Sequence, residues 1–215
     1  MKVKISMAIL ILLLSFFEIG AISDNIGGSK NALNLLELKA RNVSEFEENG
    51  VKLQYRTKQD MQKEINRVKE YLIRNIEGNY EETNENQFEI FNQNYDINVK
   101  IWREDKYSYV EIVLINKNSE YSTTNLIDMI KRIENRESED VQYFSYYEGK
   151  NLDNGYSISK FLNGNDLTNT ELLEINNGYT GTGYLNNGYK INFALIKYNT
   201  VSHIIIGTPI IFTAY

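Results

Sequence analysis

The sequence predicts an α+β protein built from two α-β-α-β-β-β repeats with antiparallel sheets. Three observations lead to this prediction. Apolar residues recur at helical spacing in some segments, they alternate with polar residues in others, and this order of segments returns after a break near Asn118. Residues 31–118 form the first predicted repeat and residues 119–215 the second. The 215-residue chain is 42% hydrophobic, which is enough to bury a core.

The first repeat opens with a predicted helix from Asn31 to about Phe46. Its apolar residues recur at helical spacing, and the pair Asn49-Gly50 is expected to end it. Alternating apolar residues then predict a half-buried strand over 51–55. A second helix is predicted next, from apolar residues at steps of three and four. These residues are Met61, Ile65, Val68, Leu72 and Ile76.

Three strands complete the first predicted repeat. A polar loop over 79–86 leads into a short strand over 88–91. Alternation predicts longer strands over 95–104 and 107–116. Because only two residues separate these last two segments, we expect them to form an antiparallel hairpin.

The second predicted repeat begins at Ser122, whose hydroxyl is suited to cap a helix. That helix carries a stripe of Leu126, Ile130 and Ile133, and strand-like alternation follows over 141–147. A Gly-rich link precedes the last two strands. The remaining predicted elements are a helix over 152–162 and strands over 171–175, 189–199 and 201–212.

Residues 1–23 are predicted to be a signal peptide or a membrane anchor. Lys2 and Lys4 precede an apolar run over 5–17, which has the length of a signal-peptide core. Small residues stand just before Asp24, where a signal peptidase would cut. We therefore expect the folded part of the chain to lie outside the cytoplasmic membrane.

An uncleaved anchor is the alternative, and it would tether the chain to the membrane through residues 5–22. Residues 24–30 are rich in Gly, Ser and Asn and are predicted to be a linker. The chain has no Cys, which excludes a disulfide framework and a lipid-modified cysteine.

The charge balance bears on the partners of the protein. The formal net charge is −6 at pH 7, and Glu and Asp gather in several clusters along the chain. An acidic surface repels nucleic-acid phosphates and gains nothing from counterion release. We therefore expect no nucleic-acid partner, and the predicted export points the same way.

The sequence predicts no catalytic, metal-binding or cofactor-binding residues. His203 is the only histidine, and without Cys or a recognisable partner it is interpreted as a structural strand residue near a turn. The many carboxylates are interpreted as groups on solvated helix faces. A site built from Cys or several His residues is excluded by composition.

The Gly-rich stretch over 178–188 is the predicted contact surface. It lacks the following helix and the Lys-Ser/Thr end of a phosphate loop. Tyr179, Tyr184 and Tyr189 each follow a Gly, and exposed Tyr on an adaptable loop suits contact with a glycan or a peptide. The alternative is a Tyr-rich hairpin loop that packs on its own sheet.

Several features together carry a resemblance to a known family. They are the N-terminal signal, Gly50-Val51 before a strand, Asn192-Phe-Ala-Leu in a later strand, and the closing Gly207-Thr-Pro-Ile-Ile with Tyr215 last. The chain thereby resembles the YwmB family of exported proteins from Gram-positive bacteria. It departs from that family at Ala214, where an acidic residue is usual, and at Tyr55, where a Trp is usual. The resemblance implies a duplicated fold similar to TATA-box-binding protein, and it implies no particular activity.

The predicted function is that of a non-enzymatic cell-envelope module that binds a protein or a cell-wall component. The alternative is an exported hydrolase that uses carboxylates. The two differ in whether an Asp or Glu lines a concave pocket with apolar walls. Likeness to a DNA-binding fold is no evidence for DNA binding, because function depends on the site rather than on the fold.

Overall fold

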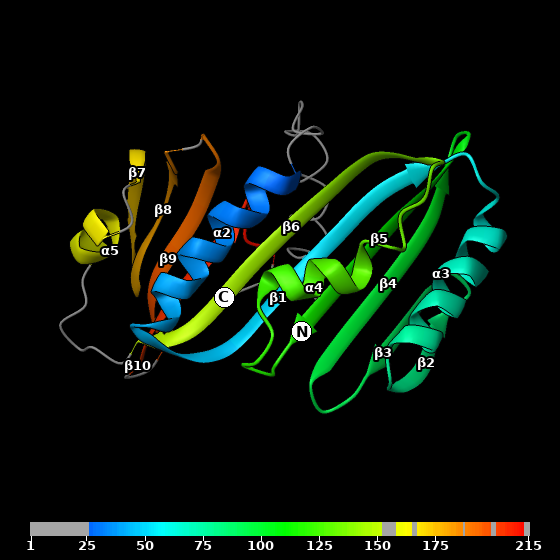
Figure 1. The fold of residues 1–215 in the computed structure, drawn as a ribbon, viewed down its shortest axis with the longest axis horizontal. Coiled ribbons are helices and arrows are strands. Elements are labelled where there is room, and N and C mark those ends of the chain that lie inside the picture. Colours follow the sequence, from blue (N-terminus) through cyan, green and yellow to red (C-terminus); the bar gives the residue numbers. More distant parts are fainter. Residues whose placement is uncertain (1–25, 152–157, 165–166, 187, 199–200, 213–215) are drawn as a thin grey trace.

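A computed structural model describes residues 26–151, 158–164, 167–186, 188–198 and 201–212. The predicted signal or anchor over 1–23 lies outside these described residues. Within them, a single ten-stranded antiparallel sheet carries four helices (Figure 1). None of these four helices is both long enough and apolar enough to cross a membrane.

Each half of the described chain has a helix, a long strand, a second helix and four more strands. The first half comprises α2 (Ile26–Arg41), β1 (Ser44–Thr57), α3 (Met61–Asn75), β2 (Asn79–Asn84), β3 (Gln87–Phe91), β4 (Tyr95–Glu104) and β5 (Tyr107–Asn116). The second half comprises α4 (Thr123–Ile130), β6 (Ser138–Asn151), α5 (Ile158–Gly164), β7 (Thr168–Ile175), β8 (Gly178–Tyr184), β9 (Lys190–Tyr198) and β10 (Val201–Thr208).

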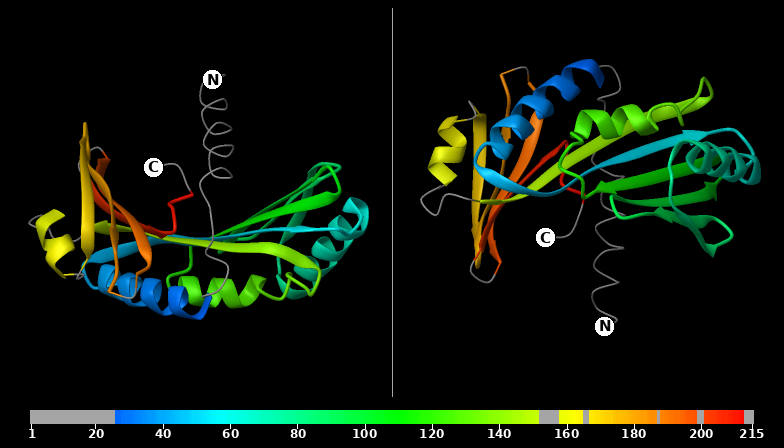
Figure 2. Two further views of the ribbon diagram at one scale, coloured as in Figure 1. Left: turned by 90° about the horizontal axis from the view of Figure 1, so that it is seen from above. Right: turned by 60° about the horizontal axis from the view of Figure 1, so that its bottom comes forward.

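The sheet is curved like a saddle, and its strand order is β2-β3-β4-β5-β1-β6-β10-β9-β8-β7. The two longest strands, β1 and β6, pair at its centre. All four helices lie against the convex face, and the chain after β10 turns onto the concave face (Figure 2, left). The helix side therefore holds most of the core, and none of the described helices covers the concave face.

The main core lies between the helices and the convex face of the sheet. Its largest cluster joins α3 and α4 to strands β1, β3, β4 and β5. A second cluster joins α2 to β6, β9 and β10. The first helix of each half thus packs on strands of the other half. Because each fully buried aliphatic side chain contributes about 1.5–3 kcal/mol, this exchange of helices joins the two halves into one cooperative unit.

A buried carboxylate fixes the two central helices to each other. Glu37 of α2 is 1% exposed. Its oxygens accept hydrogen bonds from the backbone N–H and the hydroxyl of Thr123, at 3.0 and 2.7 Å. They also accept from Arg41 at 2.8 Å and from Asn49 at 3.1 Å. This fully partnered charge holds the start of α4 against α2.

Several predicted elements are confirmed. The helix with the three-and-four stripe is α3, and its N-cap Asp60 accepts from the backbone N–H groups of Gln62 and Lys63. The predicted hairpin is β4 and β5, with Asp105 at φ 51° in the tight turn. Ser122 caps α4 in a capping box with Asn125.

The first predicted helix was wrong at both ends. In the structure this helix is α2, and it already includes residues 26–30 of the expected linker, because Gly and Ser weaken a helix without preventing it. It ends at Arg41, and β1 runs straight through Asn49-Gly50. Gly50 stands there because a Cβ would collide with the Tyr146 ring on β6. Gly50 is therefore required by close packing between strands, and it does not end a helix.

Two segments expected to be loops or links are strands. Residues 79–84 form β2, an edge strand whose side chains are mostly exposed, which explains their polar character. The Gly-rich stretch forms β8, where a Cβ at Gly181 would meet the Phe193 ring. Each half therefore has four strands after its second helix, and all ten strands belong to one sheet.

Candidate functional site

Two β-bulges distort the central pair of strands. In the first, Phe46 pairs with Gly149 and Glu48 pairs with Glu148, so Glu47 is the extra residue on β1. Phe46 packs with the core on the helix side. The bulge therefore brings Glu47 and Glu48 together onto the concave face.

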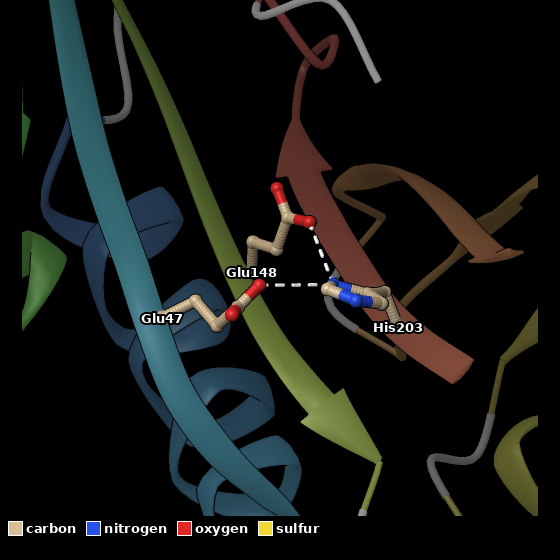
Figure 3. A group of neighbouring side chains, drawn as sticks. All are labelled: Glu47, Glu148 and His203. Carbon is tan, nitrogen blue, oxygen red and sulfur yellow. Dashed lines mark hydrogen bonds and ion pairs between the residues drawn. The ribbon is translucent and has the colours of Figure 1, made fainter. Parts of the chain in front are cut away.

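The concave face carries a cluster of Glu47, Glu148 and His203, from three adjacent strands (Figure 3). The Nδ1 atom of His203 lies 3.0 Å from Oε1 of Glu148 and 3.0 Å from Oε2 of Glu47. The imidazole side chain is 9% exposed, and the ring of Tyr198 meets it edge to face at 4.7 Å. His203 is thus held in one orientation by charged and aromatic neighbours.

The electrostatics of this cluster follow from its partial burial. Burial raises the pKa of Glu148, and the adjacent His203 counteracts part of that effect. Lys150 forms an ion pair with the outer oxygen of Glu47. Nearby, the hydroxyl of Tyr146 donates to Glu48. With these two neighbours, three carboxylates, one imidazole and one ammonium group lie close together on this part of the concave face.

A row of aromatic and cationic side chains crosses the concave face at the other end of β1. Trp102 of β4 lies opposite Tyr109 of β5, and their rings stack at 5.5 Å with an interplanar angle of 13°. Tyr109 in turn lies opposite Arg56 of β1. The guanidinium of Arg56 lies 4.4 Å from the centre of the Tyr107 ring, and the ammonium of Lys100 lies 5.5 Å from that of Trp102.

Between these two regions, the segment after β10 covers part of the concave face. Phe212 meets the Tyr146 ring edge to face at 5.1 Å. The ammonium group of Lys52 lies 4.4 Å from the Phe144 ring centre and 3.8 Å from an oxygen of Glu111. Burial lowers the pKa of Lys52, although Glu111 opposes this shift. Phe212, whose ring centre lies 5.7 Å from this ammonium group, thus helps to shield the cation from solvent.

The structure separates the three tyrosines of the predicted contact surface. Tyr179 and Tyr184 are five residues apart on β8 in continuous register, so they lie on opposite faces of the sheet. Tyr179 is half-buried opposite Leu195 on the helix side, and Tyr184 is 38% exposed. Tyr189 lies in the turn before β9, where its carbonyl accepts from Leu185. The three side chains do not form one patch.

One pocket lies on the helix side, between α3 and the end of α4. It has a volume of about 300 Å³ and is lined by Tyr71, Asn75, Ile76, Asp128, Met129, Lys131 and Arg132. Its carboxylate, Asp128, is paired with Lys131 at 2.7 Å. This pocket therefore does not offer the pair of carboxylates that the hydrolase alternative requires.

Sequence reasoning missed the Glu47–Glu148–His203 cluster. His203 was interpreted as a structural strand residue, and its burial in β10 agrees with the strand position. The sequence interpretation places the carboxylates on solvated helix faces, whereas Glu47 and Glu148 lie in strands β1 and β6. Their meeting depends on a bulge and on the pairing of β6 with both β1 and β10, and these are features that no local pattern encodes.

Comparison of the sequence with known proteins found no match. No protein-family model matches the chain, and no curated protein matches it. The site is therefore interpreted from its own geometry and chemistry.

Proposed function

We propose that this chain is an exported cell-envelope protein that binds a protein or a cell-wall component without catalysing a reaction. The row of Trp102, Tyr109 and Arg56 carries this proposal, because Trp102 and Tyr109 alternate with core residues of β4 and β5 and therefore lie on the sheet face opposite the described helices. Stacked aromatic rings offer a flat apolar surface to a sugar ring or a peptide. Adjacent cations add attraction for carboxylate groups on such a ligand.

The N-terminal pattern supports a place outside the cytoplasmic membrane. Lys2, Lys4 and the apolar run over 5–17 have the character of an export signal. Under this proposal the folded part is secreted, or it is tethered to the outer face of the membrane through residues 5–22. A cell-wall ligand would then be within reach in either case.

The element order supports the duplicated fold that the resemblance to YwmB proteins implies. The same seven-element order occurs in both halves, and the strand order reads alike outward from the β1–β6 pair. We therefore propose that two copies of one α+β unit form the chain, with a boundary near Asn118.

DNA is a poor ligand for this saddle. Carboxylates stand on its concave face at Glu47, Glu48, Glu111 and Glu148, and the chain carries a net charge of −6. These groups would repel phosphates where a DNA duplex would have to lie. The proposed ligand is therefore a glycan or a peptide, whose binding does not require a basic surface.

Trp102 allows a direct test, because it is the only Trp in the chain. Its fluorescence reports on the concave face alone. We expect soluble peptidoglycan fragments, or a fraction of envelope proteins, to quench or blue-shift this emission in a saturable way. Tyr109→Ala should weaken the response about 10-fold, since truncating a central aromatic contact commonly costs more than 1 kcal/mol.

Ile73→Ser is the matched control for this experiment. Ile73 is 49% exposed on α3, on the helix side of the sheet, so its replacement should leave binding unchanged. A chain whose Trp102 emission responds to neither ligand class would refute the proposal. Equal weakening by Tyr109→Ala and Ile73→Ser would refute the assignment to the concave face.

The hydrolase alternative has one observation in its favour, the approach of Glu47 to Glu148. Their oxygens both lie within 4.8 Å of each other and of the imidazole nitrogen. Both carboxylates are engaged with His203, however, and Glu47 also with Lys150. Hydrolysis of cell-wall glycan by the wild-type chain, abolished by Glu148→Gln, would establish this alternative in place of the binding module.

A further inference from the structure

We propose that Glu47, Glu148 and His203 form a binding site for a divalent transition-metal ion of the Zn²⁺ class. The inference rests on three side chains that converge on the concave face from β1, β6 and β10 (Figure 3). It does not depend on the ligand proposed for the aromatic row.

The spacing of the three candidate ligand atoms fits one ion. Zinc lies about 2.0–2.2 Å from nitrogen and carboxylate oxygen ligands, which places neighbouring ligand atoms about 3 Å apart. The Nδ1 atom of His203 lies 3.0 Å from an oxygen of each glutamate, and all three atoms lie within 4.8 Å of one another. With small movements of the carboxylates, a metal ion can therefore bind all three atoms, with the ring proton of the neutral imidazole on Nε2.

The donor set selects the class of ion. An imidazole nitrogen with two carboxylate oxygens suits zinc and other first-row transition ions. Calcium and magnesium prefer oxygen ligands alone and in larger numbers. Three protein ligands would leave at least one coordination position for water or an exogenous ligand.

The surroundings hold the ligands in place. Lys150 holds the second oxygen of Glu47, and the Tyr198 ring packs edge-on against His203. Such supporting contacts orient metal ligands and commonly affect affinity 10- to 100-fold. The strands that carry the three residues are hydrogen-bonded neighbours, so the site has a rigid base.

An ion can reach the site from solvent. The side chain of Glu47 is 25% exposed and that of Glu148 is 16% exposed, whereas His203 is 9% exposed. The carboxylates thus form an open rim over a buried nitrogen. Two negative charges against the single positive charge of Lys150 leave an excess that favours a cation.

The other bulge of the β1–β6 pair provides a matched control. Arg56 there contacts Glu139 and Asp140, at 3.5 and 2.9 Å, and Tyr109 occupies the position across from Arg56. That cluster has two carboxylates and a cation but no imidazole. Glu139→Gln therefore removes a comparable carboxylate without touching the proposed site.

The test uses the purified full-length chain, produced without a histidine tag, and competition with a fluorescent zinc chelator. We expect the wild type to bind one Zn²⁺ per chain, with no competition from a large excess of Mg²⁺. His203→Gln and Glu148→Gln should each weaken binding by more than about 10-fold, since both remove a direct ligand. Glu139→Gln should bind as the wild type does.

Two results would overturn the proposal. One is a wild-type chain that binds no stoichiometric Zn²⁺, and the other is a His203→Gln chain that is folded by circular dichroism and binds undiminished. If the two variants at buried positions fail to fold, Glu47→Gln decides the question, because its side chain is the most exposed of the three. Undiminished binding by Glu47→Gln would then overturn the site as defined.

Discussion

The two ends of the central strand pair share a backbone plan and differ in their side chains. Each end has a β-bulge: the end at Arg56 has its extra residue on β6, and the end at Lys150 has its extra residue on β1. At the first end Arg56 lies opposite Tyr109 of β5. At the second end Lys150 lies opposite His203 of β10. In both cases the cation pairs with carboxylates of the neighbouring central strand.

Burial separates the two ends. The side chains of Glu139 and Asp140 are 37% and 63% exposed, which is typical of a solvated ion pair. The second end instead holds a nearly buried imidazole between two half-buried carboxylates. The comparison teaches that the same backbone geometry can support either a surface ion pair or a convergent set of metal ligands. The residue opposite the cation, Tyr109 at one end and His203 at the other, determines which of the two is formed.

The largest effect on zinc binding and stability is expected from His203→Tyr, because this change places at the second end the kind of residue that Tyr109 provides at the first. We expect the Zn²⁺-dependent rise in Tm to disappear. With chelator present, stability should fall by about 1–3 kcal/mol, since a larger ring must enter a buried position. Thermal and urea unfolding with and without zinc would measure both effects.

Tyr109→His is the reciprocal control. Tyr109 is only half-buried, so this change should cost less stability than His203→Tyr. A His203→Tyr chain that kept its zinc response, or that unfolded with the stability of the wild type, would remove the basis of the comparison.

The pKa values of the carboxylates should be shifted in opposite directions at the two ends, and we expect this effect to be smaller than that of His203→Tyr. Burial raises the pKa of Glu148, whereas a hydrogen bond from Lys58 lowers the pKa of Glu139. The contribution of Glu148 to stability is thus fully present below the unfolded pKa near 4.5 and is lost as the pH rises through its folded pKa. Glu139 contributes above that unfolded pKa, and its contribution is lost as the pH falls through its folded pKa.

Carbon-detected NMR of the glutamate carboxyls, recorded with chelator, would measure these values directly. We expect Glu148 to titrate above about 4.5 and Glu139 below it. The reverse order would show that the two ends do not differ in burial in the way described.

The smallest effect is expected at Tyr184, on the concave side of β8. Its side chain is exposed, so Tyr184→Ser should change the free energy of unfolding by no more than about 0.5 kcal/mol. Urea denaturation would measure this change. A loss of several kcal/mol would place the ring in the core and contradict its assignment as a surface residue.

Local patterns in the sequence predicted the regular elements well where one periodicity dominates. The apolar stripe of α3, the cap at Ser122 and the β4–β5 hairpin each depend on residues close in sequence. Prediction failed where tertiary packing overrides local signals. Gly50 and Gly181 resemble breakers, but a Cβ at Gly50 would collide with the Tyr146 ring, and a Cβ at Gly181 would collide with the backbone carbonyl oxygen of Glu171 and with the Phe193 ring.

The candidate site could not be predicted for the same reason. Glu47, Glu148 and His203 are about 100 and 55 residues apart, and only the strand order joins them. Without the β1 bulge, Glu47 would alternate onto the helix side of the sheet. The tyrosines chosen from the Gly-rich stretch had the right chemistry for contact, but strand alternation divides them between two faces.

The most direct test of the difference between the two ends uses the single histidine of the chain. A long-range proton–nitrogen NMR spectrum of the full-length protein contains one imidazole, so both ring nitrogens of His203 can be followed during Zn²⁺ addition. We predict that Nδ1 shifts to the position of a metal-bound nitrogen and that Nε2 carries the single ring proton in the zinc-bound protein. A spectrum that Zn²⁺ leaves unchanged, or one in which Nε2 binds the ion, would contradict the account.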